Sequence, residues 1–347
     1  MTRPLRGAIL GYGHVAASGH MPFWEGHPDT DIVAIADALP SRREMFLLAH
    51  PEGRAYPTAA ALLAAETLDF ADICTPPSSH GACIELALDA GLDVLCEKPL
   101  VVSAPDALRI AGRARAAGRH VHVVHNWLKA PVCRKVSALL AKGAVGNVHC
   151  ISWDTSRTCP AVAVDEPGSV NWRMDPEVAG GGILFDHGWH AAYCVARWAA
   201  AAPDAISARL EKRRHRAWAV EDTAVLDIAF GKIEGHIHLT WAADERSNRV
   251  NITGDGGRIE VDGAEVRLHD ADGVHRWDCP PSLAAGSHHP DWFAGIGQDF
   301  LNVVAGRAAS NLGDAVMCAL LMEGAMASSA AGGEWLAIDN LRRPTAA

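Results

Sequence analysis

The sequence lacks the segments that would direct it to a membrane or a nucleic acid. No apolar segment follows Met1, and charges such as Glu66 and Glu323 interrupt the alanine-rich stretches well before bilayer length. The 31 basic residues are spread along a chain of net charge −10, which argues against a nucleic-acid or anionic membrane surface. We therefore expect a cytoplasmic protein with no nucleic-acid and no membrane partner.

Cysteine patterns typical of disulfide frameworks and zinc sites are also missing. The nine cysteines are an odd number, no Cys-x-x-Cys occurs, and Cys74, Cys96 and Cys194 lie in apolar segments. Reduced thiols that pack as small apolar groups are the expectation. His187 and His190 stand near Asp186, but this trio lacks the glutamate of zinc hydrolase motifs, so we expect no metal.

The first third of the chain alternates apolar runs with helical segments. The strand-like runs are 5–10, 32–36, 70–74, 93–96 and 120–124, and segments with helical spacing lie at 58–65, 79–90 and 103–117. This alternation predicts an α/β Rossmann fold, a doubly wound parallel sheet with helices on both faces.

Beyond Asn126 the pattern changes to longer strands joined by turn residues. One helix at about 132–142 precedes strand-like segments at 148–154, 205–212, 223–230, 233–241 and 249–253, and two helices near 292–305 and 314–330 follow. This half is typical of an α+β domain with a large, mostly antiparallel sheet. With 347 residues, 49% of them hydrophobic, we predict two domains, 1–125 and 126–347.

A glycine-rich loop follows the first predicted strand, at Gly11-Tyr-Gly-His-Val-Ala16. Gly11 permits a tight turn, Gly13 lets backbone N–H groups approach a pyrophosphate, and Ala16 allows close helix packing. Asp37 ends the second strand, where an acid bonds the adenosine ribose and repels a 2′-phosphate. The pattern predicts NAD, and NADP stays an alternative because Arg42 and Arg43 are near.

Two further signals carry acid/base chemistry. Lys98 follows a strand and precedes Pro99, so it lies at the sheet edge where ligands bind, although pairing with Glu97 alone would also explain it. Asp186 and His190 are four residues apart behind a flexible glycine run and share one face if a helix begins there. A carboxylate beside an imidazole is typical of a general acid/base.

The chain resembles the glucose-fructose oxidoreductase / inositol dehydrogenase / MocA family, in order over nearly its whole length. The matching segments are 11–16, 74–80, 96–100, 125–126, 143–146, 171–176 and 180–190. The resemblance implies a nicotinamide enzyme that transfers hydride to or from a secondary alcohol of a sugar, amino sugar or cyclitol. It also implies a homodimer or homotetramer, formed through the outer face of the second domain's sheet.

Residue roles follow from the same resemblance. It places catalysis on Lys98, Asp186 and His190: His190 takes the hydroxyl proton, Asp186 orients the imidazole, and Lys98 holds the oxygen. The same three residues would contact the substrate, together with Asn126, Trp172 and Arg173. Beside Gly11, Gly13, Asp37 and Lys98, the cofactor would contact Tyr12, His14, Val15, Thr75, Pro76, His80 and Glu97.

The sequence departs from the family pattern at several positions. Pro77 replaces an asparagine, Tyr193 replaces an aspartate three residues after the histidine, and Leu128 and Lys129 stand where arginine is common. These changes bear on substrate identity. Two alternatives stay open: a redox-neutral, NAD-assisted sugar enzyme, and a non-catalytic NAD-binding regulator.

Overall fold

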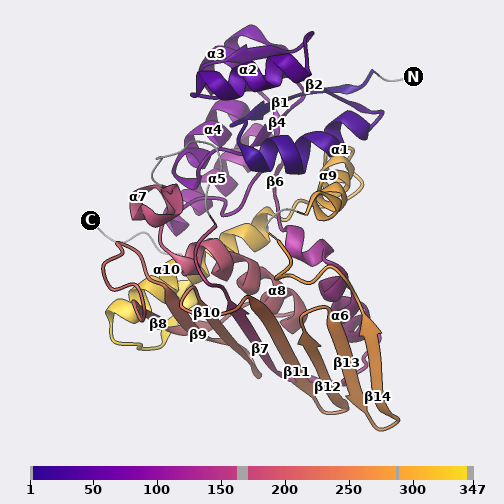
Figure 1. Cartoon of the computed structure of the whole chain (residues 1–347), viewed down its shortest axis with the longest axis vertical. Coiled ribbons are helices and arrows are strands. Elements are labelled where there is room, and N and C mark those ends of the chain that lie inside the picture. The colour runs from indigo at the N-terminus through magenta and orange to yellow at the C-terminus, as the bar shows by residue number, and fades with distance from the viewer. Residues whose placement is uncertain (1–2, 162–170, 287–288, 342–347) are drawn as a thin grey trace. The chain divides into compact units, whose positions relative to one another are not determined.

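The computed structural model describes residues 3–161, 171–286 and 289–341, and the chain divides into two compact units (Figure 1). Within the described residues, the first unit contains 3–126 and 289–316. The second contains 127–161, 171–286 and 317–341.

The first unit is built on a six-stranded sheet in the order β3-β2-β1-β4-β5-β6, in which every strand pair is parallel. The strands are β1 (Leu5–Leu10), β2 (Thr30–Ala36), β3 (Arg54–Tyr56), β4 (Phe70–Ile73), β5 (Asp93–Cys96) and β6 (Val121–Val123). The helical segments are η1 (Ala16–His20), α1 (Met21–Gly26), α2 (Pro40–Ala49), α3 (Ala59–Ala65), α4 (Pro77–Asp89), α5 (Ala104–Ala117) and α9 (Pro290–Val304). The predicted doubly wound sheet is confirmed.

Helix α9 belongs to the first unit, although the sequence analysis assigned all residues after 125 to the second domain. Its apolar side chains Phe293, Ile296 and Phe300 join the core formed by Trp24 and Phe70. No local signal reveals this return, because an amphipathic helix has the same spacing whichever sheet it covers.

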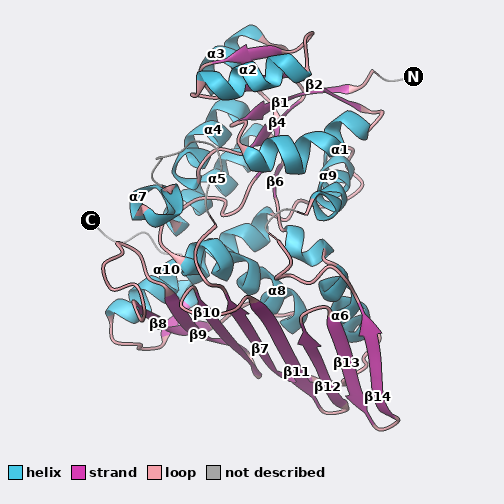
Figure 2. Ribbon diagram, in the orientation of Figure 1, coloured by secondary structure: helices cyan, strands magenta, loops and turns pink. Residues whose placement is uncertain are grey.

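The second unit is built on a nine-stranded sheet in the order β14-β13-β12-β11-β7-β10-β9-β8-β15 (Figure 2). Only the pair β7 and β10 is parallel, so the expected mostly antiparallel sheet is confirmed. The strands are β7 (Val148–Ser156), β8 (Ala205–Glu211), β9 (Thr223–Phe230), β10 (Ile233–Thr240), β11 (Ser247–Gly254), β12 (Gly257–Asp262), β13 (Glu265–Asp270), β14 (Gly273–Asp278) and β15 (Leu336–Ala337). The helical segments are η2 (Asn126–Lys129), which begins at the last residue of the first unit, α6 (Pro131–Ala141), η3 (Trp172–Met174), α7 (Pro176–Ala179), η4 (Leu184–Gly188), α8 (Trp189–Ala199), α10 (Leu312–Ala330), whose residues 312–316 belong to the first unit, and α11 (Ile338–Leu341).

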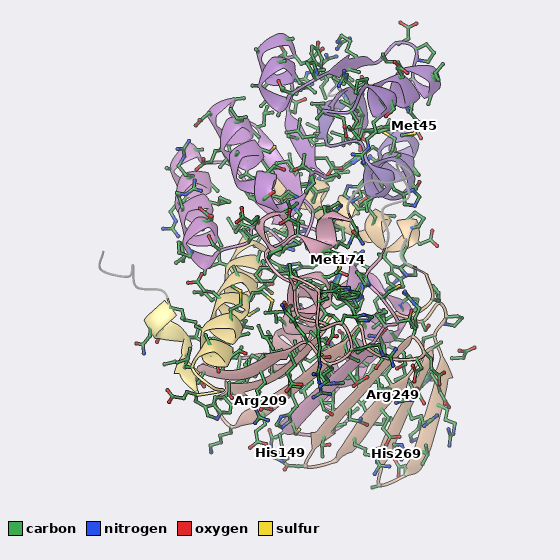
Figure 3. The ribbon with its side chains drawn as sticks, turned by 60° about the vertical axis from the view of Figure 1, so that its left-hand side comes forward. Met45, His149, Met174, Arg209, Arg249 and His269 are labelled. Carbon is green, nitrogen blue, oxygen red and sulfur yellow. The ribbon has the colours of Figure 1, made fainter. Side chains whose placement is uncertain are left out.

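The two faces of this sheet differ in chemistry. Helix α8 packs on β7 and β10, and α6 packs on β13, over the buried positions of the strands. The alternate positions carry ion pairs such as His238 with Asp154 and His269 with Glu260. Figure 3 labels Arg249 and His269 at these outward positions. The sheet therefore has one apolar face and one charged face.

Helix α10 is long and apolar enough to cross a membrane by length and composition. Its contacts are those of a core helix, because Cys318, Leu321 and Ala325 are buried. The hydroxyls of Ser328 and Ser329 accept backbone N–H groups of β8 at 2.9 Å. The apolar residues of this helix are therefore explained by their burial in the core of the second unit.

Candidate active site

The glycine loop of the first unit is shaped by the strand beside it. Gly11 has φ +88°, and a Cβ there would lie 2.7 Å from the backbone nitrogen of Thr75, so only glycine fits. At Gly13 the nearest atom to a Cβ is 3.6 Å away, on the flexible side chain of Arg42. The packing of the protein alone would therefore admit a larger residue at position 13. A glycine there is explained if the backbone must leave room for a bound pyrophosphate.

The remaining residues of the loop lead into η1. Ala16 is fully buried at the start of η1, and His14 and Val15 form the helical turn before it. The side chain of Tyr12 is buried against Phe46. Its contribution to the loop is therefore through the backbone.

Asp37 lies at the carboxyl end of β2 and is 7% exposed. Its carboxylate accepts the backbone N–H of Tyr12 at 2.7 Å and that of Leu39 at 2.8 Å, and Arg42 lies 3.4 Å away. These bonds fix the glycine loop to the second strand, a structural task that the sequence did not reveal. Arg42 donates to the same oxygen that accepts from Tyr12, whereas the oxygen that accepts from Leu39 has a second acceptor position, so a bond to a ribose remains compatible with this geometry.

The turn after β5 is held by a buried network that the sequence analysis missed. Glu97 accepts the backbone N–H of Lys98 at 2.9 Å, and its other oxygen lies 3.1 Å from Nε2 of His20. Nδ1 of His20 lies 2.9 Å from Asp72, which also accepts the indole N–H of Trp24 at 2.7 Å. The network joins η1, α1, β4 and the Lys98 turn.

The ring of His20 carries the charge that this network needs. Burial by itself lowers its pKa, but the charge and hydrogen bond of Asp72 outweigh burial and raise the pKa well above the ordinary value of 6.5. Burial likewise raises the pKa of Glu97, but the hydrogen bond and charge of His20 dominate and lower it. Both ring nitrogens face carboxylates, so His20 is an imidazolium.

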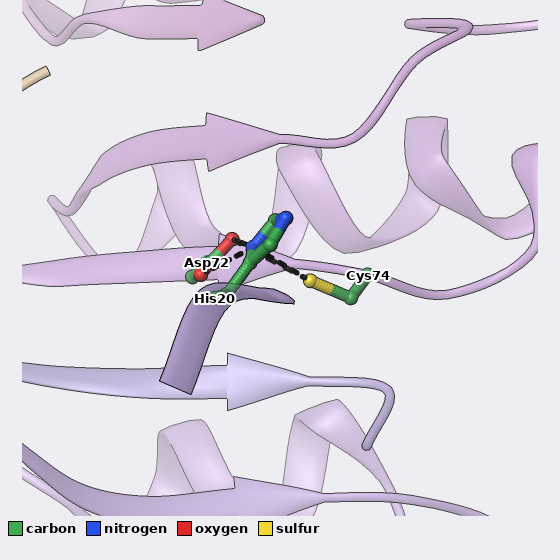
Figure 4. A group of neighbouring side chains, drawn as sticks. All are labelled: His20, Asp72 and Cys74. Atoms are coloured by element: carbon green, nitrogen blue, oxygen red, sulfur yellow. Dashed lines mark hydrogen bonds and ion pairs between the residues drawn. The ribbon is translucent and has the colours of Figure 1, made fainter. Parts of the chain in front are cut away.

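His20, Asp72 and Cys74 converge closely enough to resemble a metal site (Figure 4). Burial raises the pKa of Cys74 to about 12, so its sulfur is a thiol, and Nδ1 of His20 is protonated toward Asp72. Metal ligation requires a thiolate and an unprotonated ring nitrogen. The three side chains form a hydrogen-bonded network in which Cys74 and His20 carry protons.

The predicted cofactor residues after β4 surround the start of α4. Pro76 is the N-cap, and His80 lies between the carbonyl oxygens of Thr75 at 2.7 Å and Pro99 at 2.9 Å. Burial lowers the pKa of His80, so the neutral ring donates to one of them. The ring of His80 therefore lies between the loop after β4 and the Lys98 turn and donates a hydrogen bond to one of the two.

In the second unit, the glycine run before Asp186 is packed, whereas the sequence analysis expected a flexible segment. A Cβ on Gly182 would lie 2.0 Å from the carbonyl oxygen of Glu221, and one on Gly181 would lie 2.8 Å from the ring of Phe185. The carboxylate of Glu221 accepts the N–H groups of Gly182 at 2.8 Å and Leu184 at 3.0 Å. The run fixes the start of the following helix.

Asp186 lies in η4, a single π-helical turn that leads into α8. The sequence predicts a helix from Asp186 onward, and in the structure this segment begins with a wider, π-helical turn. The carboxylate of Asp186 lies 3.2 Å from Nδ1 of His187 and 3.7 Å from Nε of Arg173. Arg173 also covers the ring of Trp172 at 4.2 Å.

His190 lies in the first turn of α8. Its Nδ1 lies 2.6 Å from the hydroxyl oxygen of Tyr193, and its ring stacks on Trp127 at 4.3 Å with 8° between the planes. The Tyr193 hydroxyl also accepts the backbone N–H of Trp127 at 3.0 Å. The sequence analysis noted Tyr193 only as a departure, and its place one helical turn after His190 was the signal for this contact.

A buried arginine adds positive charge to this unit. Arg157 is 1% exposed, and its terminal nitrogens donate to carbonyl oxygens of Ser156, Ser247 and Leu283 and to Asn248. Burial lowers its pKa to about 10, and the charge of Asp186 acts in the opposite direction. Among the described residues its hydrogen-bond acceptors are neutral groups.

Comparison with known proteins agrees with this architecture. Residues 5–125 match an oxidoreductase family with an NAD-binding Rossmann fold, and residues 133–260 match the Gfo/Idh/MocA C-terminal domain. An oxidoreductase from Agrobacterium radiobacter, solved with NAD+, L-tartaric acid and magnesium, has TM-score 0.84 and 23% identity, with 97% of this chain and 99% of that chain covered.

Two curated relatives are similar in sequence. D-apiose dehydrogenase of Paraburkholderia graminis is 35% identical over 142 residues, which span 41% of this chain but only 38% of that protein. A dTDP-3,4-didehydro-2,6-dideoxy-alpha-D-glucose 3-reductase of Streptomyces antibioticus is 26% identical over 93% of this chain and 96% of its own length. The chain belongs to the Gfo/Idh/MocA family of oxidoreductases, and its first unit is the NAD-binding Rossmann domain of that family.

Proposed function

We propose that this protein transfers hydride between NAD and a secondary alcohol or ketone of a sugar, amino sugar or cyclitol. The observation that carries the proposal is Lys98, held by Glu97 at the carboxyl end of β5, the same sheet edge at which Gly11 packs on Thr75. The apiose dehydrogenase and the deoxyglucose reductase among the relatives support the substrate class.

Lys98, Asp186 and His190 are the residues proposed for catalysis. NAD, when bound, would supply the hydride acceptor, and the hydroxyl proton would pass to a side chain of the protein. Lys98 stabilises the charge that develops on the oxygen, and Asp186 and His190 supply the remaining polar contacts. NAD is preferred over NADP because Asp37 places a carboxylate at the end of β2.

We also propose residues that contact the substrate and the cofactor. The carbonyl oxygen of the Asn126 side chain is buried and has no hydrogen-bond partner within the described ranges, so it suits a ligand hydroxyl. The Trp172 and Arg173 pair offers an apolar face beside donors, which suits a sugar. The proposed cofactor contacts on the first unit are Gly11, Tyr12, Gly13, His14, Val15, Asp37, Thr75, Pro76, His80, Glu97 and Lys98.

A cytosolic homodimer or homotetramer is the proposed form of the enzyme. All nine cysteines are free thiols, which suits a reducing compartment. The charged face of the nine-stranded sheet is the surface proposed for subunit contacts. Sedimentation velocity gives the oligomeric state directly, and a monomer at micromolar concentration would refute this part.

The test is nicotinamide absorbance with NAD or NADP and a panel of cyclitols, aldoses and amino sugars. We expect reduction of NAD by one subset and a loss of about 100-fold or more in kcat for Lys98→Ala, with NAD affinity largely kept. Lys142→Ala, at an exposed position after α6, is the matched control.

The outcomes separate the alternatives. Turnover by Lys98→Ala at the wild-type rate would remove the lysine from the mechanism. Absence of net NADH with every compound, despite NAD binding, would favour the redox-neutral enzyme or the non-catalytic regulator.

A further inference from the structure

The imidazole of His190 is fixed from two directions. The ring of Trp127 stacks on it at 4.3 Å, which sets the plane of the imidazole. The hydroxyl of Tyr193 lies 2.6 Å from Nδ1, which sets its rotation within that plane. All three side chains are buried, with exposed fractions of 5% for His190, 6% for Trp127 and 2% for Tyr193.

The direction of the bond between Tyr193 and His190 decides what the imidazole can do. Burial raises the pKa of Tyr193 well above its ordinary value, so the hydroxyl keeps its proton. The hydroxyl oxygen already accepts the N–H of Trp127 at 3.0 Å. A phenol that donates its proton to Nδ1 uses its donor and one acceptor position at the same time.

The opposite direction is less favourable. If Nδ1–H donated to Tyr193, the N–H groups of His190 and Trp127 would both converge on one phenol oxygen. An unprotonated imidazole nitrogen is also a stronger acceptor than a phenol oxygen. The short contact therefore favours donation from the tyrosine.

We propose that Tyr193 is a positioning residue that holds His190 in the tautomer with a bare Nδ1 and a protonated Nε2. The inference rests on the proposed function, in which His190 contacts the reacting oxygen. His190 then donates a hydrogen bond from Nε2 to that oxygen and is not the group that removes the proton. This assignment replaces the base role expected from the sequence.

The chemical balance of the reaction is unchanged. In the oxidation direction NAD, when bound, would accept the hydride from the carbon, and the hydroxyl proton would leave to the carboxylate of Asp186 while Lys98 stays protonated and stabilises the oxygen. The Nε2–H of His190 stabilises the negative charge on the oxygen in either direction of the reaction. A carboxylate at position 193, which the resemblance leads one to expect, would instead accept from Nδ1–H and leave Nε2 free as a base.

The tautomer is measured by 15N NMR of histidine-labelled protein without cofactor or substrate. Signals of His190 are identified by their loss in His190→Gln. We expect the shift of an unprotonated nitrogen for Nδ1 and of a protonated nitrogen for Nε2. In Tyr193→Phe the two shifts should move toward each other, because the tautomers mix once the phenol donor is removed.

Tyr56→Phe is the matched control, because it removes a hydroxyl that binds Glu66 in the first unit. It should leave the signals of His190 unchanged. A protonated Nδ1 in the wild-type protein, or unchanged shifts in Tyr193→Phe, would overturn the proposal. This readout needs no turnover, so it stands apart from the test of the proposed function.

Kinetics test the consequence for catalysis. Glutamine keeps an N–H donor but no base, whereas leucine keeps neither. We expect kcat to fall about 100-fold in His190→Leu and clearly less in His190→Gln. Equal losses in the two variants would show that His190 acts as the base, and no turnover by the wild-type protein would count against the proposed function alone.

Discussion

Two glycines determine the backbone conformation of the loops in the candidate site. Gly11 and Gly182 both occupy positions where a Cβ would collide with backbone atoms of a neighbouring segment. At Gly11 the φ of +88° adds a second reason. Their conformations are therefore fixed by tertiary contacts.

Gly182→Ala should destabilise the second unit by about 3 kcal/mol, because the backbone at Glu221 must move to admit a methyl group. Urea unfolding measures the change. Gly112→Ala is the control, since Gly112 lies exposed in α5 with no atom near its Cβ position, and it should stabilise by about 0.5 to 1 kcal/mol. Equal effects of the two variants would contradict the packing argument.

Asp37→Ala should weaken NAD binding about tenfold and bring the affinities for NAD and NADP together. The carboxylate both repels a 2′-phosphate and fixes the N–H of Tyr12, so its loss acts on recognition and on the loop. Isothermal titration with each cofactor measures both effects. Asp31→Ala, at the exposed opposite end of β2, should change neither affinity, and an unaltered preference in Asp37→Ala would show that another group selects the cofactor.

At the scale of elements, His20 connects η1 to the ends of β4 and β5. It is the last residue of η1, and its ring bridges Asp72 and Glu97 while stacking on Phe293 of α9 at 3.7 Å. A helix, two strands and a helix distant in sequence therefore depend on one charged ring.

His20→Gln should destabilise the first unit by about 3 kcal/mol, because two buried carboxylates lose their cation. The pKa of His20 is raised in the folded protein, so its stabilisation is complete below 6.5 and is lost as pH rises through the folded pKa. The pKa of Glu97 is lowered, so its contribution is present above 4.5 and is lost as pH falls through the folded pKa.

The difference in unfolding free energy between wild type and His20→Gln should therefore be largest between these two values and shrink toward alkaline pH. Urea unfolding from about pH 5 to about pH 9 measures it. His275→Gln, which removes an exposed partner of Asp270, should cost under about 1 kcal/mol. A difference for His20→Gln that does not vary with pH would mean that the ring is neutral.

The whole molecule consists of two compact units, and the proposed cofactor contacts that follow β1, β2 and β4 belong to the first. A ligand that binds only the native state stabilises it in proportion to the logarithm of its concentration. Binding of NAD should therefore protect one unit more than the other.

At a free NAD concentration of about 100 times Kd, amides of β1 and β4 should gain about 2.7 kcal/mol of protection, while those of β9 and β10 should change little. Hydrogen exchange followed by mass spectrometry measures this. NADP at the same concentration should protect less, and the difference should vanish in Asp37→Ala. Equal protection of all four strands would show that the two units unfold together.

The sequence was informative wherever a structure depends on neighbouring residues. Local apolar periodicity predicts the strands at Leu5–Leu10 and Thr223–Phe230. Local turn chemistry predicts the glycine loop and the turn at Glu97 and Lys98. The short strand β3, Arg54–Tyr56, was missed because it has no apolar run and exists only through its pairing with β2.

By itself, the sequence determined the two fold classes, the loop at Gly11 and the presence of Lys98, Asp186 and His190, because these depend on residue type and spacing. Only the tertiary structure decided that α9 joins the first unit, that His20 holds Glu97, and that Trp127 stacks on His190. Contacts between segments distant along the chain arise from packing, which local periodicity does not encode. The same holds for the type of helical turn, such as the π-helical turn before α8.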